Sequence, residues 1–76
     1  EAQGAQKLVR MANQIATFMA TQVGDDATAG AGGVAAHLRN FWEPRMKDQL
    51  FGHVDQGGAG LHPLVIAAVG RLREPA

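Results

Sequence analysis

A proline shortly after two large aromatic residues is the feature that most limits how this chain can fold. The run from His37 to Met46 contains Phe41 and Trp42, the only tryptophan of the chain, and then Pro44. Pro44 cannot continue a helix from its amino-terminal side, although it suits the first turn of a new one. The chain must therefore turn a corner beside two rings, which serve either as the centre of its own core or as the anchor of a partner interface.

Apolar residues recur at helical spacing on both sides of this corner. Before it, spacings of three and four residues predict helices over residues 5–22 and 26–41. After it, the same spacings predict helices over residues 44–54 and 63–73. No segment shows the alternation of a β-strand. We therefore expect an all-α fold, a small bundle of three to four helices that forms a single helical domain over residues 1–76.

Residues with known preferences for helix ends lie at the expected boundaries. Gly24 follows the first helix, as a glycine just past a helix often does, and Asp25 and Asp26 offer an N-cap for the second. Pro63, with His62 near the cap, suits the start of the last helix. The adjacent aspartates are therefore interpreted as capping residues rather than as a catalytic pair.

Three glycines leave the start of the second expected helix open. Gly30, Gly32 and Gly33 each cost about 1 kcal/mol relative to alanine in a helix interior. One interpretation is a loop at this point, with the helix beginning only near Gly33. The other is a helix whose small residues let another backbone approach closely.

The first expected helix carries large apolar residues along one side. Met11, Phe18 and Met19 belong to this stripe, and their simplest interpretation is core. Because methionine adapts well to binding surfaces, a groove for a partner is the alternative.

The chain lacks the devices that usually stabilise small domains. A chain of 76 residues buries only about 60–65% of the surface that its unfolded form exposes. It has no cysteine, which excludes disulfides, thiolate zinc sites, iron–sulfur ligation and a thiol nucleophile. We therefore expect a partner chain or self-association to contribute stability.

Charge and hydropathy argue against two classes of partner. The chain has seven basic and seven acidic residues, and the basic ones are scattered, unlike those of a nucleic-acid binder. Its apolar runs are too short to span a bilayer, and no signal-peptide core is visible. We expect a cytoplasmic protein with no nucleic-acid and no membrane partner.

No catalytic, cofactor-binding or metal-binding residue is expected in this chain. His37, His53 and His62 lack the i, i+3 or i+4 spacing that places two imidazoles on one helix face. The glycine-rich residues 56–60 lack the preceding strand, and the lysine, serine or threonine, of a phosphate-binding loop. We interpret this run as a linker and the histidines as surface or partner-contact residues.

Three segments, residues 7–16, residues 37–46 and residues 57–65 with Ala68 and Val69, follow one another over most of the chain. Together they resemble the delta subunit of the soluble NAD-dependent formate dehydrogenases that contain molybdenum or tungsten. The agreement of three separate segments makes the resemblance more specific than any one of them. The glycines of residues 30–33 depart from it.

The resemblance implies a small accessory subunit of an enzyme that oxidises formate to carbon dioxide. In that family the bis-molybdopterin guanine dinucleotide lies in the large alpha subunit, and electrons pass through iron–sulfur clusters to FMN and NAD. These cofactors are implied for partner subunits and not for this chain. The implied partners are the alpha subunit and, in the same complex, the beta and gamma subunits. The implied role is assembly, cofactor insertion or stability of the complex.

We expect the partner interface at the corner before Pro44 and on one face of the first helix. The expected interface residues are Arg10, Asn13, Gln14, Arg39, Phe41, Trp42, Arg45 and Met46. The two arginines beside the rings either cover them with their stems or bridge to carboxylates of a larger subunit. One alternative function is a maturation chaperone that binds the alpha subunit transiently. A small helix-turn-helix regulator is less well supported, because no basic recognition helix is present.

Overall fold

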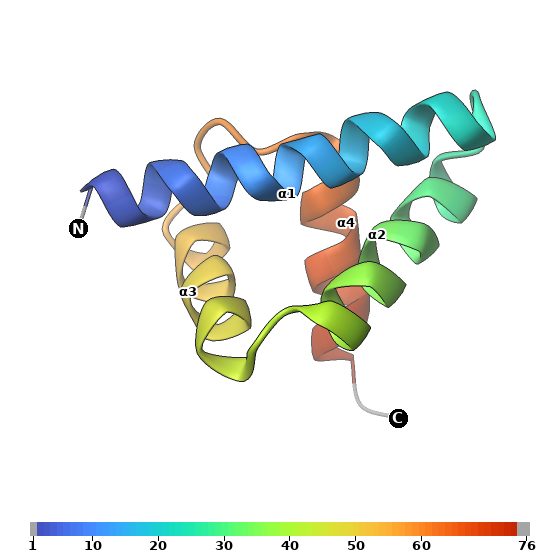
Figure 1. The fold of residues 1–76 in the computed structure, drawn as a ribbon. Helices are drawn as coiled ribbons and strands as arrows, with labels where there is room; N and C mark the ends of the chain where they lie inside the picture. The colour runs from blue at the N-terminus through green and yellow to red at the C-terminus, as the bar shows by residue number, and fades with distance from the viewer. Residues whose placement is uncertain (1, 75–76) are drawn as a thin grey trace.

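The computed structural model describes residues 2–74 and consists of four helices (Figure 1). They are α1 (Ala2–Val23), α2 (Ala27–Phe41), α3 (Pro44–Asp55) and α4 (Pro63–Arg73). No strand occurs within these residues, and the prediction of an all-α fold is confirmed. The observed helix ends lie within three residues of the expected ones, a spread that is common at helix termini.

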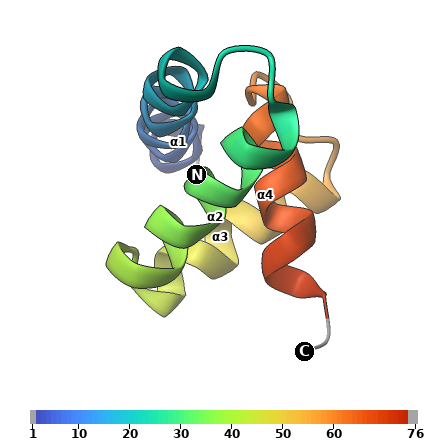
Figure 2. The ribbon, with the colours of Figure 1, turned by 90° about the vertical axis from the view of Figure 1, so that its right-hand side faces the viewer.

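The long helix α1 crosses one end of the other three helices (Figure 1). From there α2 and α4 run side by side, and both views show them adjacent (Figures 1 and 2). The most extensive contacts between helices join α2 to α4 and α1 to α2, whereas α3 touches its neighbours less. The molecule is therefore built around α2, which lies between α1 and α4.

The core lies where α1, α2 and α4 meet, with a smaller contribution from α3. Its largest fully buried side chains are Leu38, Leu50, Val34, Val65 and Val69. Ala12 and Ala16 of α1 are completely buried, and their small side chains let α1 come close to this cluster. Trp42 also belongs to the cluster, with only 7% of its surface exposed. This tryptophan is therefore part of the chain's own core.

α2 remains helical through its three glycines, so the interpretation of residues 30–33 as a loop is wrong. A Cβ atom at Gly30 would lie 3.0 Å from Leu64 Cδ1, and one at Gly33 would lie 2.7 Å from Met19 Sδ. The missing side chains thus let α2 fit closely between α1 and α4. This packing offsets the low helix propensity of glycine.

The helix starts follow the expected capping chemistry. The side chain of Asp26 accepts a hydrogen bond from the backbone N–H of Ala29 at 2.9 Å, which makes it the N-cap of α2. Pro44 and Pro63 occupy the first helical positions of α3 and α4. Gly24 has a φ of +62°, a conformation that glycine adopts without strain at a helix end. The residues at each corner therefore determine where one helix ends and the next begins.

Candidate partner interface

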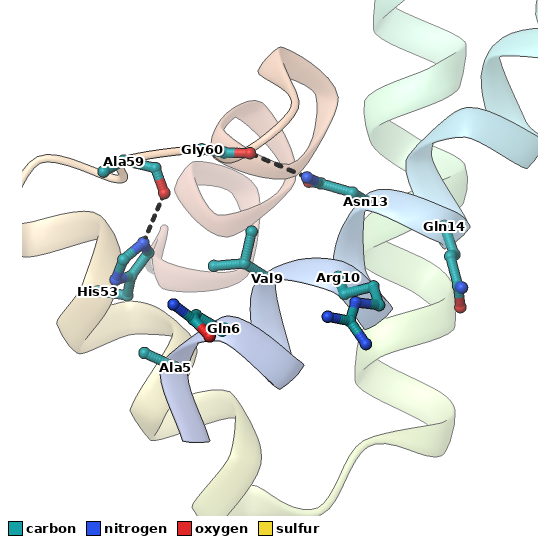
Figure 3. Close-up of a pocket in the computed structure, with 9 residues that line it drawn as sticks. All are labelled: Ala5, Gln6, Val9, Arg10, Asn13, Gln14, His53, Ala59 and Gly60. Carbon is teal, nitrogen blue, oxygen red and sulfur yellow. Dashed lines mark hydrogen bonds between the residues drawn. The ribbon is translucent and has the colours of Figure 1, made fainter. Parts of the chain in front are cut away.

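A groove of about 680 Å³ lies between α1 and the loop that joins α3 to α4 (Figure 3). We call it the α1–loop groove. Its lining is mostly apolar and comprises Ala5, Gln6, Val9, Arg10, Asn13, Gln14, His53, Ala59 and Gly60. Three of the expected interface residues, Arg10, Asn13 and Gln14, therefore meet at one surface feature.

Asn13 ties the loop to α1. Its side-chain Nδ2 donates to the carbonyl oxygen of Gly60 at 2.9 Å, and its Oδ1 accepts from the backbone N–H of His62 at 2.8 Å. These partners are 47 and 49 residues away along the chain. One half-buried amide thus fixes the end of the loop, so Asn13 is a structural part of the groove wall.

His53 binds the same loop from α3, and His62 caps the helix that follows the loop. His53 Nε2 lies 2.8 Å from the carbonyl oxygen of Ala59, and a carbonyl partner requires that this nitrogen carry the hydrogen. His62 is the N-cap of α4, where its Nδ1 accepts from the backbone N–H of Leu64 at 3.0 Å. The linker is therefore an ordered loop whose backbone is bound by the side chains of Asn13 and His53, while His62 caps the helix that follows it.

The corner between α2 and α3 separates the expected interface residues into buried and exposed ones. Phe41 is 73% exposed, whereas the next residue, Trp42, is 7% exposed. Arg39 and Arg45 are exposed, and Met46 is half-buried against the core. The corner therefore presents one aromatic ring and two arginines to the surface, and the tryptophan supports it from inside.

A second aromatic ring is exposed on α1. Phe18 is 57% exposed, so the interpretation of this residue as core is wrong. Because α1 crosses the other helices, only a narrow face of it is covered, and Phe18 lies at the edge of that face. It lines a shallow pocket of about 300 Å³ together with His37 of α2. The ring of His37 lies against that of Phe41, with centroids 4.9 Å apart, so exposed aromatic surface extends from α1 to the corner.

Several residues that complete the α1–loop groove are not recognisable from the sequence pattern. Gln6, Val9, His53 and Gly60 join the groove only because α1, α3 and the loop meet in space. Gly60 alone carried a usable signal, because it belongs to a glycine-rich run that predicts a turn. Its φ of +79° is a conformation that favours glycine.

One ion pair occurs within residues 2–74. Arg73 Nη1 donates to Asp55 Oδ1 at 2.7 Å. The hydrogen bond from Arg73 is the main reason that the pKa of the Asp55 carboxyl lies below its usual value, and the same bond raises the pKa of the arginine. In the described part of the chain, Arg10, Arg39 and Arg45 have no carboxylate within ion-pair distance. These arginines are available for contacts outside the chain.

The side chains of residues 2–74 do not fit a metal centre or an iron–sulfur cluster. The sequence has no cysteine. Over the described residues, no three His, Asp or Glu side chains gather in a way that could hold an ion. None of the helices that the structure describes is long and apolar enough to cross a membrane.

Comparison with known families matches residues 7–69 to the NADH-dependent formate dehydrogenase delta subunit FdsD. The chain belongs to the FdsD family. The matched residues include the α2–α3 corner and all of the α1–loop groove lining except Ala5 and Gln6. The resemblance read from three segments is confirmed. The chain is thus a subunit of a formate dehydrogenase complex. Comparisons with curated proteins and with solved structures find no match.

Proposed function

We propose that this FdsD chain is a non-catalytic accessory subunit of a cytoplasmic NAD-dependent formate dehydrogenase. In this proposal it supports assembly or stability of the complex by docking on the large, molybdopterin-binding alpha subunit. Its membership of the FdsD family supports a place in the complex. The observation that carries the docking role is Phe41, a large ring with 73% of its surface exposed.

Phe41 has the setting of an interface hot spot. It lies between two exposed arginines in the sequence, Arg39 and Arg45, and directly beside the buried Trp42. Interface hot spots are enriched in aromatic residues and arginine. Burying a phenylalanine side chain contributes about 1.5–3 kcal/mol. A docked subunit that covers this ring would gain that contribution without any change in the fold of the chain.

The proposal that the chain is non-catalytic is supported by the structural contacts that its histidines and its ion pair make. His53 binds the backbone of the α3–α4 loop, and His62 caps the first turn of α4. The only ion pair in the described residues is an exposed one at the end of α3. We therefore assign the pterin, the iron–sulfur clusters and the FMN of the enzyme to the alpha, beta and gamma subunits.

The test is a pull-down with the tagged chain from its native cytoplasm, followed by an assay of formate-dependent NAD reduction on the eluate. We expect the large subunit to be recovered with activity and in fixed proportion to the chain. Recovery of an inactive large subunit alone would instead assign the chain to transient maturation. Recovery of no other formate dehydrogenase subunit would overturn the docking role.

A variant makes the same test specific to the corner. We expect Phe41→Ala to reduce the amount of large subunit recovered, whereas Ile66→Ala, an exposed apolar position on α4, should leave it unchanged. Equal recovery with both variants would show that docking does not use the corner.

A further inference from the structure

We infer that the α1–loop groove binds an apolar segment that bears a carboxylate, contributed by a neighbouring subunit of the complex. This rests on the proposed function, because it requires that the chain dock on the rest of the enzyme. The expected occupant is therefore a piece of protein chain with an aspartate or glutamate beside apolar side chains.

The shape of the groove suits apolar side chains. Ala5 and Val9 from α1 and Ala59 and Gly60 from the loop are the small or apolar residues of its lining (Figure 3). A Cβ atom at Gly60 would lie 3.7 Å from Val9 Cγ1, so the loop passes close to α1 with no side chain of its own at that point. The volume of about 680 Å³ falls in the range of about 300–1,000 Å³ that is typical of ligand pockets. Space of this size accommodates several apolar side chains of a partner.

Charge complementarity selects a carboxylate. The lining contains the guanidinium of Arg10 and several amide groups, and it contains no acidic residue. Arg10 is exposed, and no carboxylate of the described residues lies within ion-pair distance of it. A guanidinium presents a planar set of donors that matches a carboxylate in two parallel hydrogen bonds. The guanidinium of Arg10 beside an apolar lining therefore favours an acidic residue within an apolar segment.

The groove is already ordered before any partner arrives. Asn13 makes two hydrogen bonds to the loop backbone and His53 makes a third, at distances of 2.8 to 2.9 Å. A wall held in this way loses little conformational freedom on binding, which lowers the entropic cost of association. This preorganisation separates the α1–loop groove from a surface depression beside a mobile loop.

The experiment measures the affinity of the full chain for formate dehydrogenase that has been purified without it. Gln6 is exposed and lines the groove, so it accepts either charge without disturbing the core. We expect Gln6→Lys to tighten binding and Gln6→Glu to weaken it, each by about two- to fivefold at low salt. We expect Arg10→Gln to weaken binding by about five- to tenfold. The matched control is Arg71→Gln, an exposed arginine of α4 outside the groove, which should bind like the unchanged chain.

The Gln6 variants also separate charge from folding, because a damaged fold would weaken binding with both. Opposite shifts that shrink at high salt, where charge interactions are screened, support the groove as the site of an acidic partner segment. If the unchanged chain binds and the Gln6 and Arg10 variants bind equally well, the groove inference is overturned while docking stands. Shifts of the Gln6 pair in the same direction also overturn it. If the unchanged chain does not bind, the proposed docking function fails and the groove inference fails with it.

Discussion

The helices α2 and α3 are neighbours of similar length, yet they are held by different means. α2 has 15 residues, five of them buried, and its glycines bring it into close contact with α1 and α4. α3 has 12 residues, of which Leu50 alone is buried. One helix is thus held along its length by buried apolar contact. The other is held by one buried leucine, by the partly buried Met46, Phe51 and Val54, and by contacts at its carboxyl end.

The contacts at the carboxyl end of α3 are polar and exposed. His53 binds the loop carbonyl of Ala59, and Asp55 pairs with Arg73 of α4. Exposed bonds of this kind each contribute little to the free energy of unfolding. Both candidate surfaces border α3, since one is the corner that precedes it and the other uses His53 and the loop that follows it. The more weakly held helix is therefore the one beside the proposed docking surfaces, and weakly held elements are common at binding sites.

The largest effect is expected at the junction of the two helices. Trp42→Ala should lower the free energy of unfolding by about 3–5 kcal/mol, because it removes a large ring from the core at the end of α2. Urea unfolding followed by far-ultraviolet circular dichroism measures this loss. The control is Ile66→Ala, at a position that is 42% exposed. It should lower the free energy of unfolding much less than Trp42→Ala does. Equal losses would mean that the tryptophan is not central to the core.

Phe41, which precedes Trp42, should affect binding to the partner rather than the free energy of unfolding. Phe41→Ala should change the free energy of unfolding by no more than about 0.5 kcal/mol, because the ring is 73% exposed. It should weaken association with the formate dehydrogenase complex by about 2 kcal/mol, or roughly 30-fold, as loss of an aromatic hot spot does. Titration calorimetry with formate dehydrogenase that has been purified without this chain measures the second quantity. Normal affinity would place the partner surface elsewhere.

Two helical glycines test the difference between α2 and α3 directly. A Cβ atom at Gly52 in α3 meets nothing within 4 Å, so Gly52→Ala should raise the free energy of unfolding by about 1 kcal/mol through helix propensity. A Cβ atom at Gly30 in α2 would lie 3.0 and 3.1 Å from the two terminal carbons of the buried Leu64. Gly30→Ala should therefore lower it by about 1 kcal/mol, because overpacking outweighs the gain in propensity. Thermal unfolding of both variants checks the signs, and a stabilising effect at both positions would show that α2 is not closely packed.

Features that depend on neighbours in the sequence were predictable. The spacing of apolar residues gave the four helices, and Asp26, Pro44 and Pro63 are at the starts where capping chemistry places them. The glycines of α2 illustrate the limit of such reasoning. Propensity alone argues against a helix at residues 30–33, and the close contacts with Leu64 and Met19, which only the fold creates, offset it.

Features that depend on how helices cross were not predictable from one sequence. The periodicity places Phe18 on the apolar stripe of α1, but the crossing angle leaves it at the edge of the covered face and 57% exposed. Asn13 has a polar side chain off that stripe, and nothing nearby in the sequence indicates its bonds to residues 60 and 62. The corner could be identified from its rings, whereas the division between an exposed Phe41 and a buried Trp42 required the structure.

The smallest effect is expected at the end of α3, where the pair between Asp55 and Arg73 responds to pH. The hydrogen bond from Arg73 is the main cause of the lowered pKa of Asp55 in the folded chain. A carboxyl whose pKa is lowered by folding stabilises the fold above its unfolded pKa, which is about 3.9 for aspartate. That contribution is lost as the pH falls through the lower pKa of the folded state.

Arg73→Gln should therefore lower the melting temperature slightly at pH 7, and part of this difference should disappear as the pH approaches 3. The remaining difference belongs to the contact of Arg73 with the ring of Phe51, where the guanidinium carbon lies 5.3 Å from the ring centroid. That contact does not titrate in this range, because an arginine keeps its charge. Thermal unfolding of both proteins at several pH values and constant salt separates the two contributions. A difference that is the same at pH 7 and pH 3 would show that the ion pair does not stabilise α3, and that the contact with Phe51 alone accounts for the effect of Arg73.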